Sequence, residues 1–128
     1  MRYLLDTHLL LWAGQEPERL SSAAHNLMRD ESNTLFFSAA SLWEVAIKAS
    51  LKRQDFEIDP DDFHGKLLAN SYIELPVSAA HAVTFRSIAP RHKDPFDRML
   101  LAQAIHEKLT LVTVDRVLGG YQGPVMRV

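Results

Sequence analysis

Four acidic residues stand at places in this sequence where carboxylates could act together as a metal-binding or catalytic site. Two directly follow short apolar runs with the pattern of β-strands, and two lie early in segments with helical spacing. In a parallel α/β arrangement, the carboxyl ends of the strands and the starts of the following helices face one edge of the sheet. We therefore expect four side chains to meet at that edge: Asp6, Glu44, Asp97 and Asp115.

Carboxylates held close together repel one another, and the repulsion grows as water is excluded. A divalent cation resolves this conflict, because Mg²⁺ prefers oxygen ligands, keeps several waters and bridges readily to phosphate. Three acids suffice to hold one ion, and the fourth could help to hold a second ion or orient the attacking water. The expected chemistry is metal-dependent hydrolysis of a phosphodiester. Thr7 and Thr113 flank the same strand ends, where ordinary turn hydroxyls are the favoured interpretation over ligand-orienting ones.

Short apolar strands separated by amphipathic helices would position these acids. The predicted strands cover residues 3–5, 34–37, 72–75, 111–114 and 125–128. Helical spacing of apolar residues marks the segments 23–28, 42–49 and 96–104. Wholly apolar strands that alternate with helices indicate a parallel sheet covered on both faces. We predict an α/β fold, specifically a three-layer α/β/α sandwich with a mostly parallel central sheet.

The chain of 128 residues suits one compact domain, and we expect a single domain over 1–128. No internal repeat, low-complexity tract or Pro/Gly-rich linker divides it. The most loop-like stretch runs from residue 52 to 57 and continues through 59–62. We expect that stretch to join two helices.

Each acid taken alone also has a structural explanation. The segment 41–44 has the spacing of a capping box, and Asp94 with Asp97 has the pattern of an N-cap followed by an acid in the first helical turn. Asp6 and Asp115 could cap turns. Caps are commoner than active sites, so capping is the favoured interpretation of any one acid. Four acids at one predicted edge reverse that preference.

The composition fits a soluble globular protein and limits its chemistry. Hydrophobic residues make up 47% and charged residues 23% of the chain, which argues against disorder. The absence of Cys excludes disulfides, thiolate zinc sites and a Cys nucleophile, and a cytoplasmic location is the simplest expectation. Asp6 and His8 interrupt the apolar start before it reaches signal-peptide length, and no segment is long enough to span a membrane. With a net charge of −2, a polyanion would have to be held locally.

Basic and aromatic side chains near the acids are candidates for contacts with a nucleic-acid substrate. Trp12, Trp43 and Phe96 could stack on bases, but their apolar neighbours favour burial. His8 and His92 fall near the acidic segments, and the expected mechanism needs neither. Surface salt bridges explain any single basic residue as well as phosphate contacts do. The basic candidates are Arg91, Lys93, Arg98 and Arg116.

The four acids lie in four longer segments that follow one another in a recognisable order. The segments are 3–8, 38–48, 92–104 and 111–115. The third, which runs from His92 to Ala104 and begins His-Lys-Asp-Pro-Phe-Asp-Arg, is long and distinctive. Together they resemble the PIN-domain nucleases, and specifically the VapC-type toxins of bacterial toxin–antitoxin pairs. The resemblance extends from the first predicted strand to the last acidic motif.

The resemblance implies an endoribonuclease that depends on Mg²⁺ or Mn²⁺ and acts on an RNA substrate. By matching position, Asp6, Glu44 and Asp97 are implied to be the core metal-binding acids, and Asp115 the fourth and least uniform one. Asp94 matches a position that is often acidic, but its N-cap role explains it and keeps it out of the set. The implied partner is a cognate VapB-like antitoxin that blocks the site. A homodimer is also implied, and abundant apolar helix surface supports it.

Two other functions stay open on the sequence alone. One is a Mg²⁺-dependent phosphohydrolase with Asp6 as the nucleophile, although such a site typically has a second acid two residues later, where this chain has His8. The other is a non-catalytic Mg²⁺-binding interaction module. Such a module gains little from Glu44 and Asp97, which two further helices would bring in.

Overall fold

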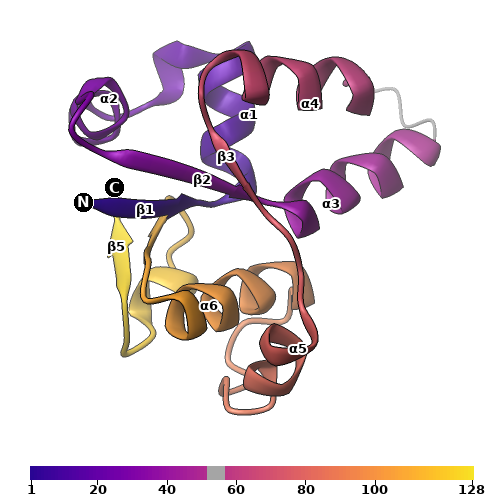
Figure 1. The fold of residues 1–128 in the computed structure, drawn as a ribbon, viewed down its shortest axis with the longest axis vertical. Coiled ribbons are helices and arrows are strands. Elements are labelled where there is room, and N and C mark those ends of the chain that lie inside the picture. The colour runs from indigo at the N-terminus through magenta and orange to yellow at the C-terminus, as the bar shows by residue number, and fades with distance from the viewer. Residues whose placement is uncertain (52–56) are drawn as a thin grey trace.

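The centre of the molecule is a five-stranded parallel sheet with helices on both faces (Figure 1). The computed structural model describes residues 1–51 and 57–128. The strands, in chain order, are β1 (Arg2–Leu5), β2 (Thr34–Ser38), β3 (Ile73–Leu75), β4 (Thr110–Thr113) and β5 (Val125–Arg127). They lie in the order β3-β2-β1-β4-β5, and each neighbouring pair is parallel. The predicted α/β sandwich is confirmed, and its described sheet is wholly parallel.

The helices include the three that were predicted and three that were not. They are α1 (Thr7–Gln15), α2 (Ser22–Arg29), α3 (Ala39–Ser50), α4 (Pro60–Ala69), α5 (Ala79–Phe85) and α6 (Pro95–Glu107), with short 3₁₀ turns η1 (Pro17–Arg19) and η2 (Leu118–Gly120). The loop expected over 59–62 is wrong, because Asp59 caps α4 and Pro60 begins it. Proline in the first turn followed by acidic residues favours a helix start. Residues 52–56 lie outside the described part of the chain.

Two apolar layers cover the two faces of the sheet. Successive side chains of a strand point to opposite faces, so neighbours in β1 enter different layers. Tyr3 and Leu5 pack in one layer with Leu9 of α1. Leu4 packs in the other with Leu101 of α6. No helix in the described ranges is long and apolar enough to cross a membrane.

The strand order reverses between β1 and β4, and this is where the acidic side chains gather. From β1 the chain proceeds outward through β2 and β3, then returns to the other side of β1 for β4 and β5. Leu5 of β1 is paired with Val112 of β4, so the next residues, Asp6 and Thr113, become neighbours. In open α/β sheets, ligands bind beyond the strand ends at such a switch point.

Candidate metal-binding active site

The carboxylate of Asp6 is buried and fixed at the end of β1. Its Oδ1 accepts a hydrogen bond from the Leu9 amide at 2.8 Å, which caps α1. Its Oδ2 accepts from the Thr113 hydroxyl and from the Val114 amide. Burial raises the pKa of Asp6, and these hydrogen bonds oppose the rise. The capping interpretation is therefore confirmed for Asp6, and the same bonds hold its carboxylate rigidly beside β4.

The start of α6 presents Asp97 to the same edge. Asp94 is the N-cap, because its Oδ1 accepts from the Phe96 amide at 2.9 Å, and Pro95 occupies the first turn. This confirms the predicted cap. Asp97 follows in the first turn and is only 5% exposed. The helix start thus places a buried carboxylate close to the strand ends.

Asp97 lies in the combined field of several neighbouring acids. Burial is the main cause that raises the pKa of Asp97 from its usual 3.8 to about 7. The charges of nearby carboxylates add to this rise, and the His92 ring opposes it. Those carboxylates belong to Asp94, Asp6 and Glu44. Carboxylates from three segments therefore interact at Asp97, and the sequence predicts three of those acids, Asp6, Glu44 and Asp97, to lie together.

The beginning of α3 differs from its prediction. Ser38, the last residue of β2, is the N-cap, and its hydroxyl accepts from the Ala40 amide at 3.0 Å. The capping box predicted at 41–44 is wrong, because the helix starts a turn earlier, directly at the strand end. Ser41 lies inside α3, where its Oγ accepts a hydrogen bond from the Thr7 hydroxyl at 2.8 Å. This buried contact fixes α3 against α1.

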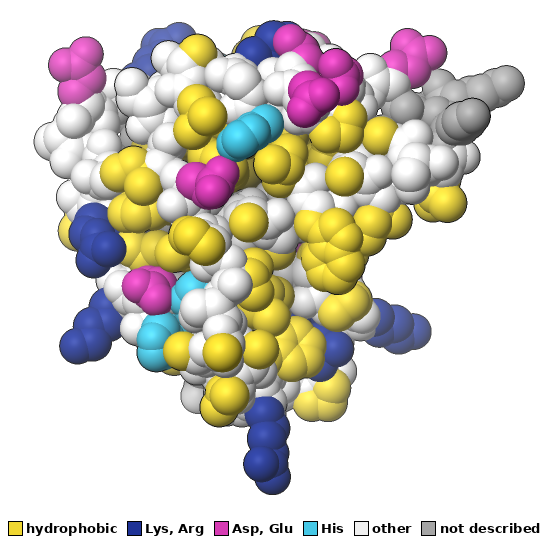
Figure 2. Space-filling view, turned by 45° about the vertical axis from the view of Figure 1, so that its right-hand side comes forward, with side chains coloured by type: hydrophobic (Ala, Val, Ile, Leu, Met, Phe, Trp, Pro, Cys, Tyr) yellow, Lys and Arg dark blue, Asp and Glu magenta, His cyan; other side chains and the backbone are white. Residues whose placement is uncertain are grey.

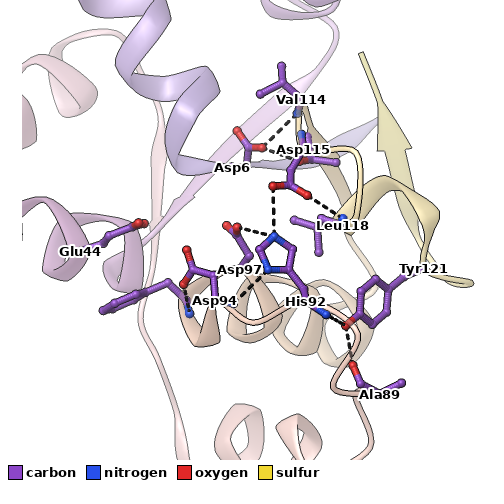
Figure 3. A network of polar contacts seen from close by, with 12 residues as sticks. Asp6, Glu44, Ala89, His92, Asp94, Asp97, Val114, Asp115, Leu118 and Tyr121 are labelled. Carbon is purple, nitrogen blue, oxygen red and sulfur yellow. Dashed lines mark hydrogen bonds and ion pairs between the residues drawn. The ribbon is translucent and has the colours of Figure 1, made fainter.

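Glu44 extends from α3 toward Asp97 (Figure 3). The side chain is buried, and its Oε2 lies 3.3 Å from the Lys48 ammonium one turn later. Its Oε1 is buried and accepts no hydrogen bond from any described residue. A buried carboxylate oxygen without a hydrogen bond lowers the stability of the fold unless another group, such as a cation or a water, binds it.

Asp115 follows β4 and is partly exposed. Its Oδ1 accepts from the Leu118 amide at 2.8 Å, and its own amide donates to the Thr113 hydroxyl at 2.9 Å. Burial alone would raise the pKa of Asp115, but the hydrogen bond from the Leu118 amide and the adjacent His92 ring hold that pKa below its usual range. The predicted turn-capping role is therefore confirmed. Thr113 connects Asp6 and Asp115, a larger role than the turn hydroxyl that its sequence context favoured.

His92 is a site residue that the sequence did not identify. Its Nε2 lies 3.1 Å from Oδ2 of Asp97 and 3.1 Å from Oδ2 of Asp115 (Figure 3). One ligand atom from each of these three residues lies within 4.8 Å of the others. Asp6 and Glu44 are outside this tight group, although their charges act on Asp97. The only signal in the sequence was the position of His92 beside the Asp94 motif.

Two of the other candidates for RNA contacts, Arg98 and Trp43, pack against aromatic rings. The Arg98 guanidinium stacks over the Phe85 ring of α5, 4.7 Å from its centroid. The predicted burial of Trp43 is wrong, because its side chain is 63% exposed. The buried residues of α3 fall on another face of that helix, and Trp43 instead meets the edge of Phe96 with ring centroids 5.1 Å apart.

The strand order and the acidic cluster at the switch point agree with the protein family that the sequence motifs resemble. Residues 3–122 match the PIN domain, and the chain is a member of the PIN-domain family. It is 34% identical to Ribonuclease VapC22 of Mycobacterium tuberculosis, over 94% of this chain and 92% of that protein. The resemblance that the sequence motifs predicted is confirmed.

Solved structures with the same fold include two toxin–antitoxin assemblies. VapBC2 from Rickettsia felis, bound to a DNA fragment from the promoter of these proteins, aligns with a TM-score of 0.70 at 18% identity, covering 99% of this chain and 98% of that one. A toxin–antitoxin complex from Klebsiella pneumoniae aligns with a TM-score of 0.67 at 17% identity, covering 97% and 95%. At such identities the likeness establishes the fold.

Proposed function

We propose that this chain is a metal-dependent endoribonuclease and the toxin of a toxin–antitoxin pair. Asp6, Glu44 and Asp97 hold Mg²⁺ or Mn²⁺ in this proposal, and Asp115 supports them. The observation that carries it is Asp97, a buried carboxylate whose pKa rises to about 7 among other acids. A divalent cation is the group that would stabilise the ionised form of such a cluster.

The donor set fits a hard cation. Its protein atoms are carboxylate oxygens, and the Glu44 Oε1 is buried with no hydrogen bond from the described residues. When bound, the ion would lower the pKa of an attacking water and offset charge on the phosphodiester. The chain's own contribution is positional, because Thr113 and the Leu9 amide fix Asp6 while the first turn of α6 fixes Asp97.

RNA is the proposed substrate because the relative at 34% identity is a ribonuclease. A phosphohydrolase with Asp6 as the nucleophile is less well supported by the geometry. Asp6 is 1% exposed, and both of its oxygens accept hydrogen bonds. A nucleophile needs an oxygen that is open to the phosphorus atom, whereas a ligand needs only a remaining lone pair.

Metal-dependent cleavage of RNA tests this function directly. The purified chain is incubated with structured RNA, duplex DNA and p-nitrophenyl phosphate, in EDTA or in millimolar Mg²⁺ or Mn²⁺. We expect RNA alone to be cut, and only with metal. We also expect metal to raise the melting temperature, because the ion binds only the assembled site. Cleavage in EDTA, or hydrolysis of the small ester alone, would contradict the proposal.

An exposed apolar surface supports the proposed protein partners. A groove of about 560 Å³ lies between α3, α5 and α6 and is lined by Trp43, Phe85, Phe96 and Met99 among others. Apolar side chains gather across the face shown in Figure 2. Val83 of α5 is 74% exposed. Exposed patches of this kind mark protein interaction sites.

We propose that this surface serves both a homodimer and a VapB-like antitoxin, the latter because similar folds occur in toxin–antitoxin complexes. Sedimentation velocity of the chain alone at micromolar concentrations should show a dimer. The product of an adjacent small gene should co-purify with the chain and suppress RNA cleavage. A monomer at every concentration would remove the dimer, and an adjacent protein that binds without inhibiting would remove the antitoxin.

A further inference from the structure

The hydrogen bonds of His92 determine where its ring carries a proton. Nδ1 of the ring accepts a hydrogen bond from the Asp94 amide at 3.0 Å. A neutral imidazole has one protonated nitrogen and one accepting nitrogen, so the proton of His92 lies on Nε2. That Nε2 is the atom placed between Asp97 and Asp115, 3.1 Å from an oxygen of each. Its N–H is shared between them and makes a well-aligned hydrogen bond to neither.

The backbone of His92 is held independently of the two acids. Its amide donates to the Tyr121 hydroxyl at 2.8 Å, and that hydroxyl donates to the Ala89 carbonyl. Arg91 stacks over the same Tyr121 ring, 5.3 Å from its centroid. The His92 side chain is only 12% exposed. The Tyr121 hydroxyl holds the backbone of His92, and the Asp94 amide holds Nδ1 of its ring, so the ring keeps its place between the acids.

We infer that the His92 N–H occupies the place that a second cation would take between Asp97 and Asp115. On this view the cluster accepts a single divalent ion, on the side of Asp6 and Glu44. Asp115 acts through His92 as a positioning residue and is not a metal ligand. The inference rests on the proposed metal-dependent function, and it excludes one of the two roles that the sequence left open for the fourth acid, that of holding a second ion.

A competing arrangement would make His92 itself a ligand, since three ligand atoms of His92, Asp97 and Asp115 lie close enough to hold an ion. Coordination through Nε2 needs its lone pair, and Nε2 carries the proton as long as Nδ1 accepts from Asp94. Binding would require either a ring with no proton or the loss of that hydrogen bond. A ring that donates between the carboxylates avoids both costs.

Counting bound Mn²⁺ distinguishes these arrangements. Metal-free protein is titrated with Mn²⁺ at constant ionic strength, and free Mn²⁺ is measured by electron paramagnetic resonance. We expect one ion per wild-type chain and two in His92→Ala, where Asp97 and Asp115 face each other without the ring. In His92→Ala/Asp115→Asn the count should return to one. The control His25→Ala, which removes an α2 ring that contacts the Pro17 carbonyl, should bind one ion.

Each other result has a distinct meaning. Two ions in the wild type, or one in His92→Ala, would overturn the inference and leave the proposed function intact. Loss of the ion in a folded His92→Ala would instead identify the ring as a ligand. A wild type that binds no Mn²⁺ would remove the metal site on which the proposed function depends.

The wild-type protein offers a second measurement that needs no variant. Long-range ¹H–¹⁵N correlation spectra of histidine side chains report which ring nitrogen carries the proton. For His92 we expect the Nε2–H form both without metal and with saturating Mg²⁺. A change to the Nδ1–H form on adding Mg²⁺ would show that Nε2 has become a ligand and would overturn the inference.

Discussion

Asp97→Asn is expected to abolish nearly all metal-dependent RNA cleavage while the protein stays folded. The substitution keeps the shape of the side chain and removes a ligand charge from the centre of the cluster. Loss of a residue that only hydrogen-bonds to a metal ligand typically costs about 10–100-fold in metal affinity or activity. Removal of a proposed ligand should cost more than this. The rate of RNA cleavage at saturating Mg²⁺, compared with wild type, measures the effect.

The same substitution should stabilise the metal-free protein, and the gain should depend on pH. Asp97 has a pKa of about 7 in the folded chain, against a usual 3.8. The folded state therefore binds the Asp97 proton more tightly, and unfolding free energy falls as pH rises from about 4 to about 7. A pKa difference of one corresponds to about 1.4 kcal/mol. Asn does not titrate in this range. The unfolding free energy of Asp97→Asn in EDTA should therefore exceed that of the wild type by an amount that grows from about pH 4 to about pH 7.

Two further variants separate a metal ligand from a structural acid. Glu44→Gln should also lose nearly all cleavage while the protein stays folded, because it keeps the side-chain shape and the buried Glu44 Oε1 has no hydrogen bond among the described residues to lose. Asp62→Asn removes an exposed acid that pairs with Lys66 on α4 and should leave cleavage unchanged. If Asp97→Asn and Glu44→Gln were destabilised but active, both acids would be structural and the proposed site would be wrong.

Thr113→Val is expected to lower both stability and cleavage, although it changes no charge. The buried Thr113 hydroxyl donates to Oδ2 of Asp6 and accepts from the Asp115 amide. Valine has a similar shape but leaves both partners without this contact. An unsatisfied buried polar group costs about 1–3 kcal/mol. Cleavage should fall by about 10–100-fold, as for other residues that orient a metal ligand.

The matched control for this prediction is Thr113→Ser, which keeps the hydroxyl and removes only a methyl group. Chemical denaturation in EDTA gives the unfolding free energy, and RNA cleavage in Mg²⁺ gives the activity. Serine should retain most of the activity, whereas valine should not. Equal activity in the two variants would show that the hydroxyl does not position Asp6 for cleavage.

The sequence by itself determined the elements that carry strong local signals. Apolar runs identified the five strands, and Pro95 after the Asp94 cap identified the start of α6. The positions of Asp6 and Asp115 directly after strands placed them at one edge, because parallel strands share a carboxyl edge. These features depend on residues near one another in the chain. Local order and the family motifs were enough to predict the fold class and to place the acids together.

Only the tertiary structure decided how those acids are held and what lies between them. The pairing of Leu5 with Val112 brings the Thr113 hydroxyl to Asp6, a contact across 107 positions of the chain. The placement of His92 depends on the Tyr121 hydroxyl, which lies 29 positions away. The periodicity of apolar residues depends on residues near one another in the chain, so it does not predict contacts between residues this far apart. The role of His92 therefore follows from the fold.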